Sequence, residues 1–321
     1  MADATLKRLR CEHKRRAPSA TRTEINIPGT KCSIYTQVSL ANLTSYRVGG
    51  PAEWYIDPHS LSDLQQMVAW ARSKGLAITV LGAGSNLLVS DLGLPGLAVC
   101  TRNLRYTKFD QKTSQVISGA GVPIARLARQ VARQGWQGLE WAVGIPGTVG
   151  GAVVMNAGAH KSCIADILVS AQVLSQTGTT EKLRPSDLGY GYRISVLQGG
   201  ESLVTEATFQ LQPVGDPVGV MATTKAHLKQ RHATQPYHLP SCGSVFRNQE
   251  PYKAGWLIEQ TGLKGYKIGG AQVSELHANF ILNCGSATAS DIFKLIGYVQ
   301  DRVEQRWSIR LEPEVKIMGE F

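Results

Sequence analysis

The feature that most constrains the fold of this chain is an alternation of short apolar runs with stretches whose apolar residues recur at helical spacing. A first helix is expected to start after Ser60, a good N-cap, and to stop at Gly75. The run 77–81 then has the character of a buried strand and ends in the glycine-rich loop 82–86. The pattern indicates a mixed class, α/β or α+β, and of the two we expect α+β.

The same periodicity predicts the remaining elements. Pro123 stands at the first turn of a second helix, whose buried face is expected to carry Ile124, Leu127, Ala128 and Val131. A helix is expected over 218–232, and a last one from Ser290 with inward residues Ile292, Leu295, Ile296, Val299 and Val303. Strands are expected at 116–118, 167–174, 202–211 and 311–318. The Pro- and Gly-containing segment 212–216 is a plausible domain boundary.

Composition excludes several classes of protein. The chain has 321 residues, 43% hydrophobic and 18% charged, which argues against collagen, coiled coil and wholesale disorder. No run of about 18 apolar residues occurs, so no membrane span is expected. None of the six cysteines falls in a CxxC pair. We therefore expect no metal site, and reduced thiols in a cytoplasmic protein.

Half of the net positive charge lies in the first tenth of the chain. Residues 1–31 hold eight basic and three acidic side chains, a surplus of five, whereas the whole chain has a net charge of +10. We expect a disordered basic tail over 1–35, with a targeting peptide as the alternative. The remaining body is only mildly basic, which suits an anionic small molecule as well as nucleic acid. Because the charge clusters in the tail and forms no Lys/Arg stripes interleaved with aromatics through the body, we expect no nucleic-acid partner.

Two glycine-rich loops point to a ligand. One is 82–86, and the other spans 144–158, with glycines at 144, 147, 150, 151 and 158. Glycine lets a backbone approach a ligand closely, and successive N–H groups of such a loop can hold phosphate. Two such loops suggest a dinucleotide, although Leu87 and Ile124 stand where the third glycine of the Rossmann fingerprint belongs and no GxxxxGK[ST] loop exists. Tight turns alone are the alternative.

Two further segments carry reactive side chains. Tyr192 and Arg193 could hold a carboxylate by a forked guanidinium contact, or could form a surface turn. Ser244 follows a glycine and precedes an apolar pair, so a strand edge could present it. Cys242 is conceivable as a nucleophile, but no histidine stands recognisably beside it, and a lone cysteine is more often a small apolar residue.

A pair of glutamates lies near the end of the chain. In a strand, Glu312 and Glu314 would face the same side. Two such glutamates are usually solvated. One held in a pocket could instead act as an acid, because burial favours its protonated form.

Taken together, these segments resemble the MurB family, UDP-N-acetylenolpyruvoylglucosamine reductase. The similarity covers about 40–319, and its motifs occur in family order. They are NLTSYRVGG at 42–50, VLGAGSNLLV at 80–89, GIPGTVGGA at 144–152, YRIS at 192–195, GSVFRN at 243–248, GGAQVSELHANF at 269–280 and LEPEV at 311–315. Any one of these would be weak, but the ordered set is strong.

The resemblance implies a fold and a cofactor. It implies a FAD-binding domain of the vanillyl-alcohol-oxidase (PCMH) type over 36–214 and a smaller α/β substrate-binding domain over 215–321. A domain of this type explains a dinucleotide site that lacks the Rossmann glycines. The chain resembles the shorter subtype, which lacks an inserted tyrosine-bearing loop over the substrate.

The resemblance also implies a reaction in peptidoglycan precursor synthesis. NADPH would reduce FAD, and the flavin would deliver hydride to C3 of the enolpyruvyl group of UDP-N-acetylglucosamine enolpyruvate. Arg193 and Glu314 match the groups that stabilise the charge building on C2, and Ser244 matches the serine that protonates C2. Expected FAD contacts are Arg47, Gly82, Ala83, Gly84, Ser85, Asn86, Gly147, Thr148, Gly150, Gly151 and Asn156. Expected contacts to the substrate's diphosphate and uridine are Tyr192, Arg231, Arg247 and Asn248.

Some positions depart from the family pattern. Arg247 stands where the family usually has Lys, and Gln249 where it usually has Pro. Cys242 replaces a customary Ala, and the pair 160–161 replaces an aromatic-Gly pair. None of these touches the three catalytic matches. The alternatives are another flavin oxidoreductase of the same superfamily and, from a different class, a basic nucleic-acid-binding protein.

Overall fold

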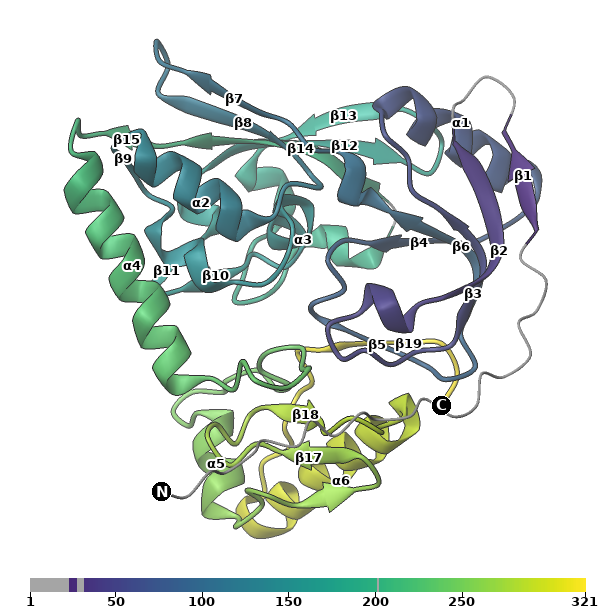
Figure 1. Cartoon of the computed structure of the whole chain (residues 1–321), viewed down its shortest axis with the longest axis vertical. Helices are drawn as coiled ribbons and strands as arrows, with labels where there is room; N and C mark the ends of the chain where they lie inside the picture. Colours follow the sequence, from purple (N-terminus) through teal and green to yellow (C-terminus); the bar gives the residue numbers. More distant parts are fainter. Residues whose placement is uncertain (1–22, 28–31, 201) are drawn as a thin grey trace, which may run out of the picture.

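The computed structural model of the chain describes residues 23–27, 32–200 and 202–321. Two five-stranded sheets form the larger part of the molecule, in the upper half of Figure 1. The first sheet has the order β1 (Glu24–Asn26), β2 (Ser33–Ser39), β3 (Pro51–Ile56), β6 (Leu94–Cys100), β4 (Ile78–Leu81). The second has the order β13 (Thr180–Leu183), β12 (Leu168–Ser175), β14 (Ser202–Gln210), β8 (Gln115–Gly119), β7 (Thr107–Asp110).

One hydrophobic core joins these two sheets to their helices. Helix α1 (Leu61–Ser73) starts at the predicted cap, where the Ser60 hydroxyl accepts from the Asp63 N–H at 3.1 Å. Helix α2 (Ile124–Arg133) buries the four residues predicted for its inner face. Helix α3 (Val149–Val154) packs on β14. The same cluster contains Ile34 and Leu97 from the first sheet and Phe209 from the second, so these elements form one body.

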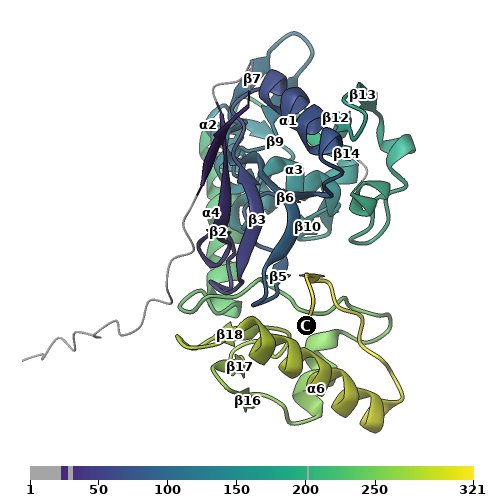
Figure 2. The ribbon, with the colours of Figure 1, turned by 90° about the vertical axis from the view of Figure 1, so that its right-hand side faces the viewer.

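The C-terminal part is smaller and lies beneath the two sheets (Figures 1 and 2). It contains β16 (Lys267–Ile268), β17 (Ala271–Val273) and β18 (Ile281–Asn283), with helices α5 (Ala254–Gln260) and α6 (Ala289–Trp307). The five residues predicted for the inner face of the last helix are all buried, from Ile292 to Val303. This helix is capped by Thr288, so it begins one residue earlier than expected.

The chain and its packing join the two parts at several places. Helix α4 (Pro217–Thr234) packs on α2 and on the turn Glu140–Gly144, and the chain then enters the C-terminal part. Strand β19 (Lys316–Met318) returns to the larger part and pairs in parallel with β5 (Leu87–Val89). Tyr46 and Leu88 are fully buried in the C-terminal core. The domain boundary expected between residues 214 and 215 stays a prediction. Helix α4, which follows it in sequence, packs on the larger part.

Asp91 clamps the C-terminal part to the larger part. Its carboxylate accepts the N–H groups of Ala289 and Ser290, both at 2.9 Å, and the Ser290 hydroxyl at 2.8 Å. A carboxylate at a helix N-terminus binds N–H groups that have no partner within the helix. The start of α6 is therefore held both by its own cap and by a residue about 200 positions away in sequence.

Two predictions are wrong in detail. The tail expected over 1–35 includes Glu24–Asn26 and Ser33–Tyr35, which pair as β1 and the start of β2; residues 1–22 and 28–31 lie outside the described residues. Only 316–318 of the expected strand 311–318 is a strand. The carbonyl of Val245 accepts both the Glu314 and the Val315 N–H, at 2.7 and 3.3 Å, which is a bulge that breaks the alternation of faces. Glu312 is consequently exposed, whereas Glu314 points inward.

Candidate active site

A cavity of about 570 Å³ opens between the glycine-rich loops of the larger part and the segment 242–248 of the C-terminal part. This volume is typical of ligand and cofactor sites. Most of the residues predicted for the site line it, from segments far apart in sequence. They are Gly82, Ala83, Gly84, Ser85, Asn86, Gly147, Thr148, Gly150, Gly151, Tyr192, Arg193, Arg231, Ser244, Asn248 and Glu314.

The two glycine-rich loops lie against each other along this cavity. The Ser85 hydroxyl donates to the Pro146 carbonyl at 2.8 Å. A Cβ at Gly82 would come within 2.8 Å of the Thr148 Oγ1, so only glycine allows this approach without a shift. The structure thus joins two loops that the sequence predicted separately.

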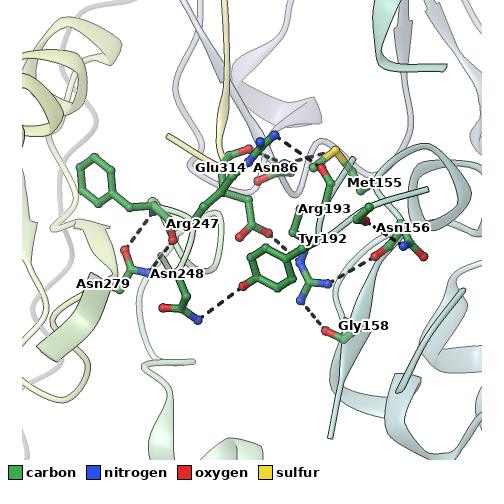
Figure 3. A network of polar contacts seen from close by, with 12 residues as sticks. Asn86, Met155, Asn156, Gly158, Tyr192, Arg193, Arg247, Asn248, Asn279 and Glu314 are labelled. Carbon is green, nitrogen blue, oxygen red and sulfur yellow. Dashed lines mark hydrogen bonds and ion pairs between the residues drawn. The ribbon is translucent and has the colours of Figure 1, made fainter. Parts of the chain in front are cut away.

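Arg193, which lines the cavity, is held by three acceptors, and Figure 3 shows its bonds to them. Its Nε donates to the Glu314 carboxylate at 3.2 Å, and Nη1 and Nη2 donate to the carbonyls of Asn156 and Gly158 at 3.3 and 2.6 Å. The guanidinium also lies 5.1 Å from the centre of the Tyr192 ring. The charge of Arg193 is therefore fixed in place before any ligand binds.

The backbone of Arg193 is strained. Its φ is +58°, in the left-handed region that residues with a Cβ rarely adopt. Its carbonyl accepts from the Gln198 Nε2 at 2.8 Å, and the turn is closed by hydrogen bonds in both directions between Gly191 and Ile194. Strain of this kind persists where surrounding contacts hold it, and it concentrates at functional sites.

Glu314 is largely buried beside two arginines. Burial raises the pKa of the Glu314 carboxyl, and the charges of Arg193 and Arg247 oppose that rise without cancelling it. The Asn86 side chain donates to the Glu314 backbone carbonyl at 3.0 Å. Asn86, the last residue of the loop 82–86, therefore holds the backbone of Glu314 at the cavity.

Ser244 lies at the cavity on a segment held by the C-terminal part. Its neighbours Val245 and Phe246 donate their N–H groups to the Asn279 carbonyl and side-chain oxygen, both at 2.9 Å. Within the part of the chain that the structure describes, the Ser244 hydroxyl has no hydrogen-bond partner. Its backbone is fixed while its hydroxyl remains available to a ligand.

Three expected site residues are not placed as predicted. Arg47 is exposed, and neither it nor Arg247 lines the cavity, among the residues described. The Asn156 side chain is buried and used internally, because it donates to the Gly191 carbonyl at 2.9 Å and accepts from the Ala165 N–H at 3.0 Å. Through these two bonds the Asn156 side chain supports the loop that carries Arg193.

The expected phosphate-binding role of the backbone near Gly150 also needs correction. The Gly150 N–H donates to the Ala120 carbonyl at 2.9 Å, and the Gly151 N–H donates to the Thr148 hydroxyl at 3.3 Å. These donors are already satisfied, so they do not offer the free N–H groups that the sequence suggested. A Cβ at Gly151 would meet only the Thr148 Oγ1, at 3.6 Å. The protein's own packing therefore does not require glycine at position 151. A glycine there is consistent with a ligand that lies close to the backbone.

The substrate contacts predicted on the C-terminal side are partly brought together. The Arg231 side chain lies against Gly144, where a Cβ would come within 2.4 Å of the Arg231 Cδ. The Arg231 Nε donates to the Tyr237 hydroxyl at 2.8 Å. The Asn248 side chain donates to the Tyr192 hydroxyl at 3.4 Å. Arg247 instead points its Nη2 at the Arg193 carbonyl, 3.5 Å away.

Cys242 behaves as a structural residue. It is buried, and its Sγ donates to the Leu87 carbonyl at 3.2 Å. Burial raises the pKa of its thiol to about 12, so the thiolate that a nucleophile requires is disfavoured. The interpretation as a small, inert side chain is the better one.

Sequence reasoning missed residues that support the site from behind the cavity or, like Gln198, from its lining. Arg102 binds three backbone carbonyls at 82, 83 and 43, and Gln198 holds the Arg193 carbonyl. His160, one of the departures, stacks on His227 of α4 with ring centres 4.0 Å apart. This stack packs the hairpin β10–β11 (158–163) against α4. The same hairpin carries Gly158, whose carbonyl accepts from Arg193. Such partners lie far apart in sequence, and no local pattern marks them.

Comparison with known proteins places this site in a family. The model of the UDP-N-acetylenolpyruvoylglucosamine reductase C-terminal domain matches residues 235–318, and the FAD binding domain model matches residues 52–184. A UDP-N-acetylenolpyruvoylglucosamine reductase from Nostoc sp. is 63% identical, over 95% of this chain and 92% of the relative. One from Synechocystis sp. is 54% identical, over 92% of this chain and 94% of the relative. The chain belongs to the UDP-N-acetylenolpyruvoylglucosamine reductase (MurB) family.

A solved structure agrees with this assignment. The crystal structure of UDP-N-acetylenolpyruvylglucosamine reductase from Thermus caldophilus matches with a TM-score of 0.75 and 34% identity, covering 88% of this chain and 98% of that one. The protein is thus an FAD-binding oxidoreductase of the MurB family, with the expected α+β fold and a second, C-terminal part.

The residues of the 82–86 loop fit the diphosphate of FAD. The carbonyls of Gly82 and Ala83 accept from Arg102, and the Gly84 carbonyl accepts from the Ser45 N–H at 3.0 Å. Among the described residues, the N–H groups of Ala83, Gly84 and Ser85 have no protein acceptor. Successive unpaired N–H groups beside a cavity are a suitable site for an anion.

Among the described residues, no group of three or more histidine, cysteine, aspartate or glutamate side chains is arranged to hold a metal ion. None of the helices in the described ranges combines the length and apolar character needed to cross a membrane.

Proposed function

We propose that this MurB-family protein uses FAD to pass hydride from NADPH to the enolpyruvyl group of UDP-N-acetylenolpyruvoylglucosamine, giving UDP-N-acetylmuramate. We place this reaction in the cytoplasmic synthesis of peptidoglycan precursors. The observation that carries the proposal is the meeting of Arg193, Glu314 and Ser244 at the same cavity as the glycine-rich loops. When bound, FAD supplies the hydride acceptor and donor of this reaction.

Arg193 is proposed to stabilise the charge that develops on the substrate. Hydride addition to C3 leaves negative charge on C2 and its carboxylate. The guanidinium is already fixed by two carbonyls and Glu314, so little reorganisation accompanies the reaction. Two of the three groups that Arg193 binds, the carbonyls of Asn156 and Gly158, are neutral. Its positive charge can therefore still attract a substrate carboxylate.

Glu314 is proposed to act in its protonated form. Burial already raises the pKa of its carboxyl. A substrate carboxylate brought next to Glu314 adds a like charge, which raises that pKa further. A protonated Glu314 donates a hydrogen bond to the developing enolate, whereas the ionised form would repel it.

Ser244 is proposed to deliver the proton to C2. Its hydroxyl lines the cavity and has no protein partner among the described residues, so it is free to point at substrate. Serine is a weak acid in water. The strongly basic C2 and the exclusion of water by the bound ligands make the transfer feasible.

The remaining contacts follow from the lining of the cavity. We propose that the FAD lies along the segments 82–86 and 147–151, with its diphosphate at the free N–H groups of the first. The substrate's diphosphate and uridine are assigned to Tyr192, Arg231 and Asn248, which line the cavity. Arg47, Asn156 and Arg247 are not carried forward as direct contacts.

The test is NADPH oxidation by the purified protein reconstituted with FAD, with and without the enolpyruvyl substrate. Rapid oxidation only in the presence of that substrate is expected. A protein that binds FAD but ignores the substrate would indicate a different flavin oxidoreductase activity on the same fold.

A further inference from the structure

Arg102 occupies an unusual position behind the loop 82–86. It lies on the single turn Thr101–Asn103, directly after β6. Its Nε donates to the Gly82 carbonyl at 2.8 Å, and its Nη2 donates to the carbonyls of Ala83 and Leu43 at 2.8 and 2.7 Å. Among the described residues Arg102 has no carboxylate partner and does not line the cavity.

These bonds fix the direction in which the loop's N–H groups point. The carbonyl of one residue and the N–H of the next share one rigid plane and point to opposite sides when the peptide is trans. The bonds after Gly82, Ala83 and Gly84 are all trans. Arg102 draws the first two carbonyls to its own side, so the N–H groups of Ala83 and Gly84 point away from it. The Ser45 N–H does the same to the third peptide.

The side away from Arg102 is the cavity. Ala83, Gly84 and Ser85 all line it, whereas Arg102, Leu43 and Ser45 do not. A peptide whose carbonyl accepts from a guanidinium is also polarised, which strengthens the hydrogen bond its N–H can donate. The positive charge of Arg102 therefore acts through two peptide groups on any anion in front of the loop.

We propose that Arg102 is a positioning residue for the FAD diphosphate, which it never touches, through the peptide planes of Gly82–Ala83 and Ala83–Gly84. The inference rests on the proposed position of the diphosphate at this loop. The role of Arg102 goes beyond packing, since its three acceptors are backbone carbonyls and, within the described ranges, no other side chain binds the carbonyls of Gly82 and Ala83.

The first experiment measures FAD affinity of the apo-protein by quenching of flavin fluorescence. Arg102→Met keeps an unbranched stem without the donors, and Arg102→Lys keeps the charge without the fork. We expect the Kd for FAD to rise about ten- to hundred-fold in Arg102→Met and less in Arg102→Lys. Arg126→Met is the matched control, because Arg126 is exposed on α2; its Kd should be unchanged.

A second measurement separates positioning from general stability. Thermal melting of each apo-variant reports loss of fold, and Kd measured well below that transition reports the site. A lower melting temperature with unchanged Kd would mean that Arg102 is only structural and would overturn the proposal. If Arg102→Met does not fold, Arg102→Lys decides by the same comparison.

Amide NMR of the ¹⁵N-labelled wild-type protein distinguishes failure of the inference from failure of the site. Addition of ADP, which carries a diphosphate without a flavin, should move the N–H signals of Ala83 and Gly84 downfield. If they do not move in the wild type, the proposed diphosphate position is wrong and the inference falls with it. If they move equally in wild type and Arg102→Lys, with equal affinity, the site stands and the role of Arg102 is refuted.

Discussion

Ser244→Ala separates the two halves of the proposed reaction. The hydroxyl has no protein partner among the described residues, and the segment around it is held by Asn279 through backbone contacts. Removing Oγ should therefore change the free energy of unfolding by less than about 0.5 kcal/mol. It should also leave the reduction of FAD by NADPH intact, because that half-reaction needs no proton at C2 of the enolpyruvyl group.

The magnitude in the second half-reaction follows from the lost proton donor. General acid catalysis contributes about 10²- to 10⁴-fold to a rate, which corresponds to about 3–5 kcal/mol in the activation barrier. We expect the reoxidation of reduced flavin by the enolpyruvyl substrate to slow by that factor. No other hydroxyl at this segment replaces it, since Ser241 does not line the cavity.

Stopped-flow absorbance of the flavin measures each half-reaction separately. Flavin bleaching after mixing with NADPH reports the first half, and recovery of absorbance after mixing with substrate reports the second. Ser241→Ala is the control and should match the wild type in both. Equal losses in the two halves of Ser244→Ala, or a second half that is unaffected, would refute the assignment.

Three other perturbations test the site and its support. In the wild type, burial raises the pKa of the Glu314 carboxyl, so the rate of substrate reduction should fall as the pH rises through that pKa. Glu314→Gln should be slower than the wild type, and its rate should not show this fall with pH. Asp91→Ala removes three bonds to the start of α6 and should cost about 1–2 kcal/mol in urea unfolding, whereas Asp301→Ala, on an exposed part of the same helix, should cost less than about 0.5 kcal/mol. Asn156→Ala loses two buried hydrogen bonds and should cost about 2 kcal/mol and lower kcat, with FAD affinity nearly unchanged; a large loss of FAD affinity instead would restore the direct contact that the sequence suggested.

Local patterns predicted the elements well where burial and period coincide. The inner face of α6, from Ile292 to Val303, and that of α2 follow directly from apolar spacing, because a helix repeats every 3.6 residues whatever surrounds it. The Ser60 cap of α1 is likewise local. Motif order was sufficient to indicate the family and to nominate Arg193, Ser244 and Glu314.

Tertiary structure decided what these residues do for one another. Arg193 and Glu314 are 121 positions apart, and the bulge opposite Val245 that turns Glu314 inward depends on a pairing with a distant segment. Asn156 is turned away from the cavity by its two partners, and Arg102 serves a loop about 20 residues earlier in the sequence. The sequence by itself determined the elements, the family and the set of reactive side chains. Their pairing, their burial and the direction of the N–H groups that face the cavity depend on long-range contacts, which no local propensity encodes.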